Sequence, residues 1–235
     1  MSEVNTNQTE GIEQAMVSRV SKNELVRWME ESALPYRELM VCCRCASRKV
    51  ADRLEICGEE LMLQTGGSAV ESVRTGLKTP ESIVDAMVSG GLPLTAESVE
   101  RNLDDLTYVE AVCAFPGDVY ALADALLTGP EAFSLVRRED FIASPGENGY
   151  RGLHLVVSVP VTLRRERREI RVKVILLTPA MELWVNTERK FLGEKERFLP
   201  EQIAEELREC SALSAEWDQR MEQIRYNLLH HVITK

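Results

Sequence analysis

The spacing of hydrophobic and polar positions predicts helices at both ends of this chain and a sheet in the middle. Residues 21–66 have the apolar spacing of helices, interrupted near Pro35 and ended by Gly66-Gly67, so they predict two N-terminal helices. Residues 79–91 and 95–103 predict two short helices, the first with Pro80 in its first turn.

Strand-like segments follow. Residues 108–115 and 133–140 predict strands on either side of a helix over 116–129, and two long strands within 155–177 meet at the charged stretch "RRERRE". Helical spacing returns over 178–193, and residues 199–235 predict two helices separated near Cys210-Ser211. The predicted fold class is α+β, a central mixed sheet flanked by helices.

Composition limits the function classes. With 235 residues and 44% hydrophobic content, the chain can bury one sizeable core. The formal charge of -10 disfavours broad electrostatic binding to nucleic acid or to an anionic membrane. The absence of an apolar run of about 20 residues, and of a basic and apolar N-terminal leader, predicts a cytoplasmic protein. The six cysteines have no accompanying histidine cluster and are predicted to be reduced thiols.

The predicted organisation has three parts. Residues 1–22 are polar and predict a disordered tail, residues 23–198 predict the central domain, and residues 199–235 predict a C-terminal helical extension.

Six motifs in a fixed order suggest a family. They are "LPY" (34–36), "GLKTPESI" (76–83), "NLDDLTYVEAV" (102–112), "EDFIASPGENGYRGLH" (139–154), "KVILLTPAMELWVNTERK" (173–190) and "LPEQI…MEQIR" (199–225). In this order, over about residues 25–230, the chain resembles the small alarmone synthetases of the RelA/SpoT family. The resemblance implies a nucleotidyltransferase-like synthetase fold and transfer of pyrophosphate from ATP to the 3′-hydroxyl of GDP or GTP.

The guanine side of the implied site is retained. The resemblance implies that Tyr150 stacks on guanine and that Asn148 and Glu188 read the base edge, which suits an aromatic face and a carboxylate acceptor. From the residues alone, Tyr150 beside the Asn148-Gly149 turn would equally predict a hairpin residue covering the sheet edge. Other residues in family-like places, implied to bind nucleotide, are Lys78, Ser82, Arg151, His154 and Lys190.

The catalytic side departs from the family pattern. The resemblance implies Mg²⁺ held by an Asp, matched by Asp105, and by a Glu, whose position is occupied by Lys173. An ammonium there removes an oxygen ligand and repels the cation. Four expected phosphate-side cations are replaced by Gly76, Glu139, Gly146 and Leu177, and further departures are Tyr108, Glu110 and Gly152.

Two functional hypotheses follow. The chain is either a catalytically degenerate nucleotide-binding or interaction module, or a diverged synthetase that uses Mg²⁺ through a relocated ligand such as Glu182, Glu169 or Asp104. Strand alternation argues against Glu169 and Asp104. Because Glu110 and Lys173 exchange sign relative to the family, we expect Lys173 to form, or to lie within one water of, an ion pair with Glu110. Strand alternation puts Glu110 on the face opposite Asp105, so this pair requires a bulge or bend between the two, and otherwise Lys173 should pair with Asp105.

The sequence also predicts which binding partners the chain has. The resemblance and the apolar stripes of the terminal helices predict a homo-oligomer, a dimer or tetramer. RNA contact through Arg164, Arg165, Arg167 and Arg168 is disfavoured, because Glu166 and Glu169 interleave with these arginines and no aromatic residue accompanies them.

Overall fold

A computed structural model of the chain describes residues 23, 26–27, 34–65, 67–192 and 200–233. The predicted N-terminal tail, and most of the helix predicted before Pro35, lie outside these residues. The first long element is α3 (Leu34–Thr65), which has Pro35 in its first turn, where a proline is tolerated.

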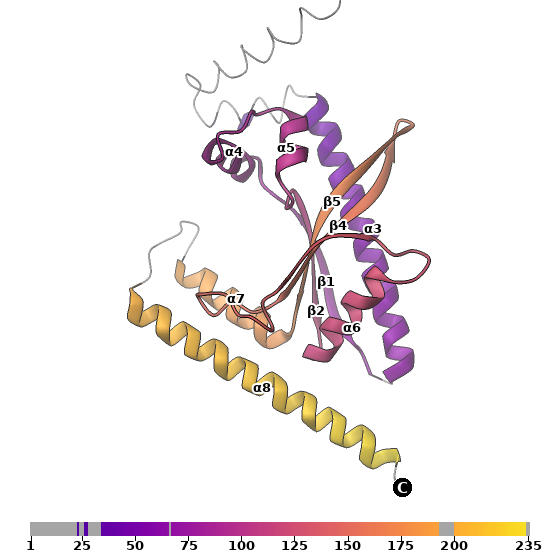
Figure 1. Cartoon of the computed structure of the whole chain (residues 1–235), viewed down its shortest axis with the longest axis vertical. Coiled ribbons are helices and arrows are strands. Elements are labelled where there is room, and N and C mark those ends of the chain that lie inside the picture. Colours follow the sequence, from indigo (N-terminus) through magenta and orange to yellow (C-terminus); the bar gives the residue numbers. More distant parts are fainter. Residues whose placement is uncertain (1–22, 24–25, 28–33, 66, 193–199, 234–235) are drawn as a thin grey trace, which may run out of the picture.

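A five-stranded mixed sheet forms the centre of the molecule (Figure 1). Its strands, in spatial order, are β1 (Val70–Leu77), β2 (Thr107–Cys113), β5 (Glu166–Leu177), β4 (Leu153–Leu163) and β3 (Ser134–Asp140). Only β2 and β5 are parallel neighbours, and the other three pairs are antiparallel. The α+β class with a central mixed sheet is confirmed.

Helices α4 (Pro80–Ser89) and α5 (Ala96–Asn102) begin as their sequences predict. Thr79 caps α4 by accepting a hydrogen bond from the backbone N–H of Ser82, and Thr95 caps α5 in the same way through Ser98. The helix α6 (Pro116–Leu127) follows β2, and α7 (Pro179–Leu192) follows β5 directly.

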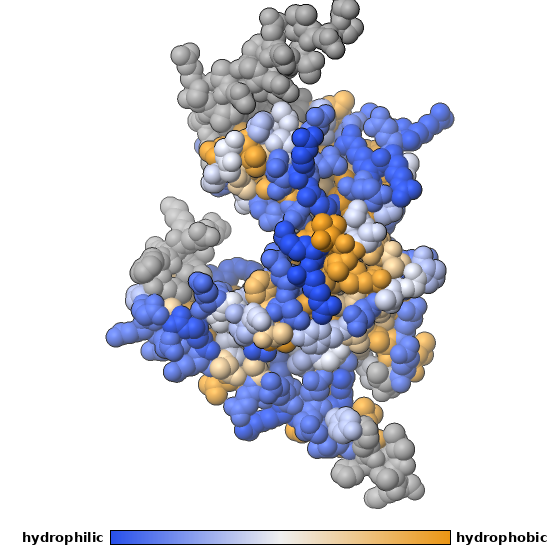
Figure 2. Space-filling model, viewed as in Figure 1, coloured by the Kyte–Doolittle hydropathy of each residue, from blue (hydrophilic) through white to orange (hydrophobic). Residues whose placement is uncertain are grey.

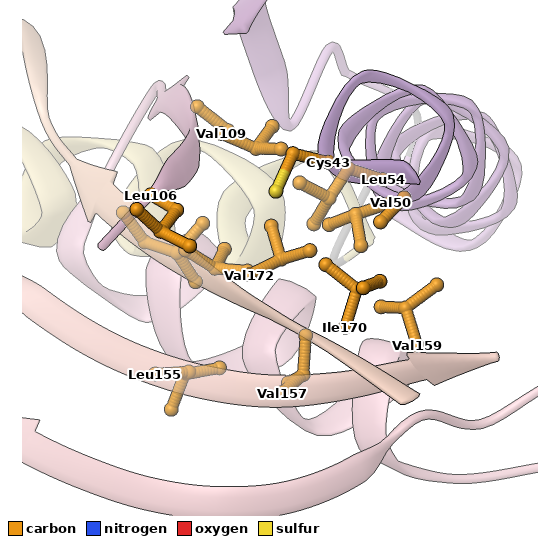
Figure 3. Close-up of a cluster of buried hydrophobic side chains, with 14 of the residues drawn as sticks. Cys43, Val50, Leu54, Leu106, Val109, Leu155, Val157, Val159, Ile170 and Val172 are labelled. Carbon is orange, nitrogen blue, oxygen red and sulfur yellow. The ribbon is translucent and has the colours of Figure 1, made fainter. Parts of the chain in front are cut away.

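The core lies between α3 and one face of the sheet. In Figure 3, Val50 and Leu54 of α3 approach Ile170 and Val172 of β5, with Val109 of β2 beside them. All five side chains are buried. Because strand side chains alternate, the residues between these buried positions project from the opposite face of the sheet, and Lys173 is one of them.

Two elements differ from the sequence prediction. The strand β1 was not predicted, because its alternation of apolar and polar residues is short and is interrupted by charged side chains. The two helices predicted over 199–235 are a single helix, α8 (Glu201–Ile233), which continues through Cys210-Ser211. Ser211 does not break the helix, because its hydroxyl donates a hydrogen bond to the backbone O of Gly149 in another segment.

A pair of residues on the open face of the sheet explains two departures from the family pattern together. Gly76 of β1 lies directly opposite Tyr108 of β2, and a Cβ at residue 76 would lie 2.2 Å from the Cζ of Tyr108. The phenol ring therefore occupies the space that a side chain at residue 76 would need. Relative to the pattern that the family resemblance implies, the small residue is on β1 and the large residue is on β2 in this chain.

We predict that Gly76→Ala lowers the free energy of unfolding by about 1–3 kcal/mol, because the added methyl group overpacks against the Tyr108 ring. Chemical denaturation would measure this. Gly67→Ala is the control, since nothing lies within 4 Å of a Cβ there. In a Tyr108→Ala background the Gly76→Ala penalty should largely disappear, and an undiminished penalty would contradict the packing explanation.

Candidate functional site

A cavity of about 580 Å³ lies on the open face of the sheet, beside α7. Its floor comes from the ends of β1, β2 and β5 and its wall from α7. The lining residues are Arg74, Thr75, Lys78, Asp105, Tyr108, Glu110, Lys173, Ile175, Asn186 and Arg189. The face shown in Figure 2 is hollowed between the part that contains α4 and the part that contains α7. The motifs around Lys78, Asp105 and Lys173 thus meet, although they are far apart in sequence.

Each carboxylate at this cavity is paired with a cation other than Lys173. Asp105 accepts a hydrogen bond from the Nζ of Lys78 at 2.7 Å. Glu110 is bound by Arg74 at 2.8 Å, and the same guanidinium also binds Glu182 of α7. The interaction with Glu182 is the largest of the effects that raise the pKa of Arg74.

Lys173 therefore forms no direct ion pair with either carboxylate, and a contact through one water stays a prediction. Neither Asp105 nor Glu110 has an oxygen within 4.0 Å of its Nζ, because Lys78 and Arg74 occupy both carboxylates. Strand alternation would place Glu110 on the face opposite Asp105, but Asp105 precedes β2 and does not follow the alternation of that strand. Glu110 and Asp105 can thus line the same cavity.

This set of side chains is a poor fit for Mg²⁺. Among the residues that the structure describes, no group of three or more His, Cys, Asp or Glu side chains could hold a metal ion. Asp105 is engaged by an ammonium, and a second ammonium, Lys173, lines the same cavity. Hard divalent cations require several oxygen ligands and are repelled by nearby positive charge.

The three alternative metal ligands considered from the sequence do not supply the missing oxygen ligand. Glu182 is bound to Arg74, as described above. Asp104 is bound by Arg137 at 2.8 Å and by Arg171 at 2.6 Å. Glu169 accepts hydrogen bonds from Ser158 and Arg167. Neither Asp104 nor Glu169 is among the residues that line the cavity.

The cavity retains cations that sequence reasoning missed. Arg74 belongs to the strand that was not predicted, and Arg189 lies one turn beyond Asn186 on α7. Within the described part of the chain, no carboxylate lies within 4.0 Å of Lys173 or Arg189. Two cations without a carboxylate in that range thus line the same cavity as the Tyr108 ring, which is 37% exposed.

The predicted guanine-reading residues form a second cluster. The amide of Asn148 donates to Glu188 at 2.7 Å, and its oxygen accepts from the backbone N–H of Tyr150 at 3.0 Å. The loop and α7 are thereby joined through the two side chains expected to read a base. Asn148 and Glu188 thus lie next to each other, while their contact with a base stays a prediction.

The Tyr150 side chain contacts two other aromatic rings, those of His154 and Phe141. Its hydroxyl forms a 2.5 Å hydrogen bond with Nε2 of His154, and the Phe141 ring meets both rings edge-on, at centroid distances of 5.5 and 5.2 Å. A Cβ at residue 152 would lie 2.7 Å from the Tyr150 hydroxyl, so Gly152 permits this inward position. The ring is half-buried rather than projecting freely.

The protonation of this pair follows from burial and charge. Burial lowers the pKa of His154 to about 4, with Lys173 and Arg137 acting in the same direction, so the imidazole is neutral near pH 7. Burial also raises the pKa of Tyr150, and the charge of Glu110 adds to this effect. The hydrogen bond therefore joins a neutral phenol and a neutral imidazole, and the tautomer of His154 determines which of them donates.

Three predicted site residues lie outside both groups. Ser82 contributes to the first turn of α4, where its hydroxyl accepts from Thr79 at 3.0 Å. Lys190 is exposed on α7. Arg151 acts on the buried Asp218: burial raises the pKa of that carboxyl, and Thr178 and Arg151 partly offset the effect. None of the three is among the residues that line the cavity.

Most of the arginines considered for RNA contact form ion pairs with glutamates. Arg164 and Arg165 form the turn between β4 and β5, both with positive φ, and Arg164 pairs with Glu38 at 2.9 Å. Arg167 pairs with Glu169 at 3.0 Å, and Arg168 lies 3.8 Å from Glu166. Of the helices described, none is both long and apolar enough to cross a membrane.

Comparison with known proteins places this site in context. The family model "Region found in RelA / SpoT proteins" matches residues 75–192, half of the chain. The GTP pyrophosphokinase YwaC of Bacillus subtilis (strain 168) is 28% identical over 169 residues, which are 72% of this chain and 80% of that protein.

Solved structures of the same group share the fold. Small alarmone synthetase 1 from Bacillus subtilis, bound to its product pppGpp, superimposes with a TM-score of 0.73 at 24% identity, over 82% of this chain and 97% of that one. Small alarmone synthetase 2 from the same organism gives 0.71 at 26%, over 81% and 97%. The chain therefore belongs to the RelA/SpoT family, and its fold is that of a small alarmone synthetase.

Proposed function

We propose that this protein is a catalytically degenerate relative of the GTP pyrophosphokinases that binds a guanine nucleotide without transferring pyrophosphate. The observation that carries the proposal is the charge arrangement of the cavity. Its carboxylates are neutralised by Lys78 and Arg74, and Lys173 adds an ammonium where metal binding would need an oxygen ligand. Pyrophosphoryl transfer depends on a metal that bridges the phosphates.

The retained half of the site supports nucleotide binding. Its relative from Bacillus subtilis is bound to pppGpp, a guanine nucleotide. In this chain the Tyr150 ring is fixed by His154, and the Asn148–Glu188 pair presents an amide and a carboxylate beside it. A base would exchange that mutual hydrogen bond for contacts with its own edge, so we expect weak rather than tight binding.

We predict no detectable alarmone when the purified protein is incubated with ATP, Mg²⁺ and either GDP or GTP. Lys173→Glu alone should not restore synthesis, because Lys78 would still occupy Asp105 and the other phosphate-side cations would still be absent. Chromatography of the 3′-pyrophosphorylated product measures this. Turnover similar to that of an active synthetase assayed in parallel would contradict the proposal and favour the diverged enzyme.

We predict that GDP or GTP binds measurably more tightly than ATP, and that removal of Mg²⁺ with a chelator leaves the affinity unchanged. Calorimetry with each nucleotide tests this. Tyr150→Ala should weaken binding by about 1–3 kcal/mol through loss of stacking. Tyr226→Ala, which removes a ring exposed on α8, is the control. Equal binding of all three nucleotides, or none, would refute the assignment.

The surface between α7 and α8 supports self-association. A groove of about 630 Å³ is lined by Pro179, Ala180, Leu183, Trp184, Thr187, Phe191, Leu207, Cys210, Ser214 and Trp217. Leu183 is 69% exposed, and Phe191 is 62% exposed. Contiguous exposed apolar surface of this kind is typical of an interface, and we propose that a second copy of the chain covers it.

We predict that Leu183→Glu shifts the protein to a smaller species in sedimentation velocity, because a charge would then be placed in the apolar contact. Val88→Glu, at an exposed apolar position on α4, is the matched control and should leave the oligomeric state unchanged. A wild-type protein that is monomeric at micromolar concentration would remove the basis for the proposal.

A further inference from the structure

The C-terminal helix α8 holds the loop that carries Tyr150. The Ser211 hydroxyl donates to the backbone O of Gly149, and the Arg208 guanidinium donates to the backbone O of Glu147 at 3.4 Å. Ser211 is buried, with 4% of its surface exposed. The loop closes on itself through hydrogen bonds between Gly146 and Tyr150 and between Gly149 and Gly146.

Gly149 fits closely against the same helix. Its φ of +91° lies in the left-handed region, which favours glycine, and a Cβ there would lie 3.1 Å from both the Cα of Arg208 and the Cβ of Ser211. The loop backbone therefore approaches α8 as closely as a residue without a side chain allows. The conformation of the turn before Tyr150 and the position of α8 depend on each other.

Helix α8 also contacts α7, which carries Glu188 of the second cluster. The Asp218 carboxylate accepts from the Thr178 hydroxyl at 2.6 Å, and Thr178 in turn caps the start of α7. The Trp184 indole donates to the backbone O of Leu207 at 2.9 Å. Asn148 and Tyr150 lie on the loop and Glu188 lies on α7, so α8 is attached to both supports of the cluster (Figure 1).

We infer that Ser211 is a positioning residue for nucleotide binding, which sets the Tyr150 ring and the Asn148 amide through the backbone of Gly149. The inference rests on the proposed function for the identity of the ligand. A serine inside a helix ordinarily returns its hydrogen bond to a carbonyl of its own helix, as Ser47 does with Arg44 in α3. Ser211 directs its hydroxyl to the loop instead.

The test compares Ser211→Ala with Ser47→Ala in the full chain. Both variants remove a buried hydroxyl from a long helix, but only Ser211 contacts the loop. Hydrogen exchange measured by mass spectrometry over residues 144–152 should accelerate about fivefold in Ser211→Ala, the effect of one lost buried hydrogen bond. In calorimetry the affinity for GDP should fall by about three- to tenfold. Ser47→Ala should change neither.

The outcomes separate this inference from the proposed function. Unchanged exchange of the loop in Ser211→Ala, or an increase no larger than in Ser47→Ala, would overturn the positioning role. If the loop exchanges faster but the wild-type protein does not bind GDP, the nucleotide assignment fails and the positioning of the loop stands. Should Ser211→Ala unfold, Arg208→Ala, at a half-exposed side chain, provides the same comparison with a smaller expected change.

Discussion

Burial of one face of the sheet by α3 is the constraint on which the rest of the structure depends. The helix packs across β1, β2, β4 and β5, and its apolar side chains interdigitate with those of the strands. This contact restricts the register of β1, β2, β4 and β5, because a shift of one residue would turn apolar side chains to the solvent. It also leaves the alternate residues of the same strands on the open face, where Tyr108, Glu110 and Lys173 line the cavity.

The electrostatics of the open face follow from that placement. Lys78 and Arg74 reach the carboxylates from the end and the middle of β1, while Lys173 rises from β5 next to Tyr108 in the strand register. An oxygen ligand in the place of Lys173 would leave the cavity less positive, but Lys78 would still engage Asp105. With Lys173, two cations remain for an anionic group of a ligand, and this needs no metal.

The sequence predicted most of the fold, while the roles of the candidate site residues stay predictions. Pro80 in the first turn of a helix, long alternating strands and the motif order are local signals, and they were read correctly. The strand β1 was missed because its pairing with β2 is a tertiary interaction that overrides a weak local pattern. The partner of Glu110 was missed because Arg74 lies in that strand, and the pair of Lys78 with Asp105 was missed because a side-chain pair depends on spatial arrangement rather than on sequence spacing.

The contact between Gly76 and Tyr108 constrains how this protein could have diverged and how it could return. A side chain at residue 76 and the present position of the Tyr108 ring exclude each other, since a Cβ at residue 76 would lie 2.2 Å from the Cζ of that ring. A larger residue at 76 therefore requires that residue 108 shrinks or that its ring moves. The two positions are coupled across the strands, so the residue that one of them accepts depends on the residue at the other.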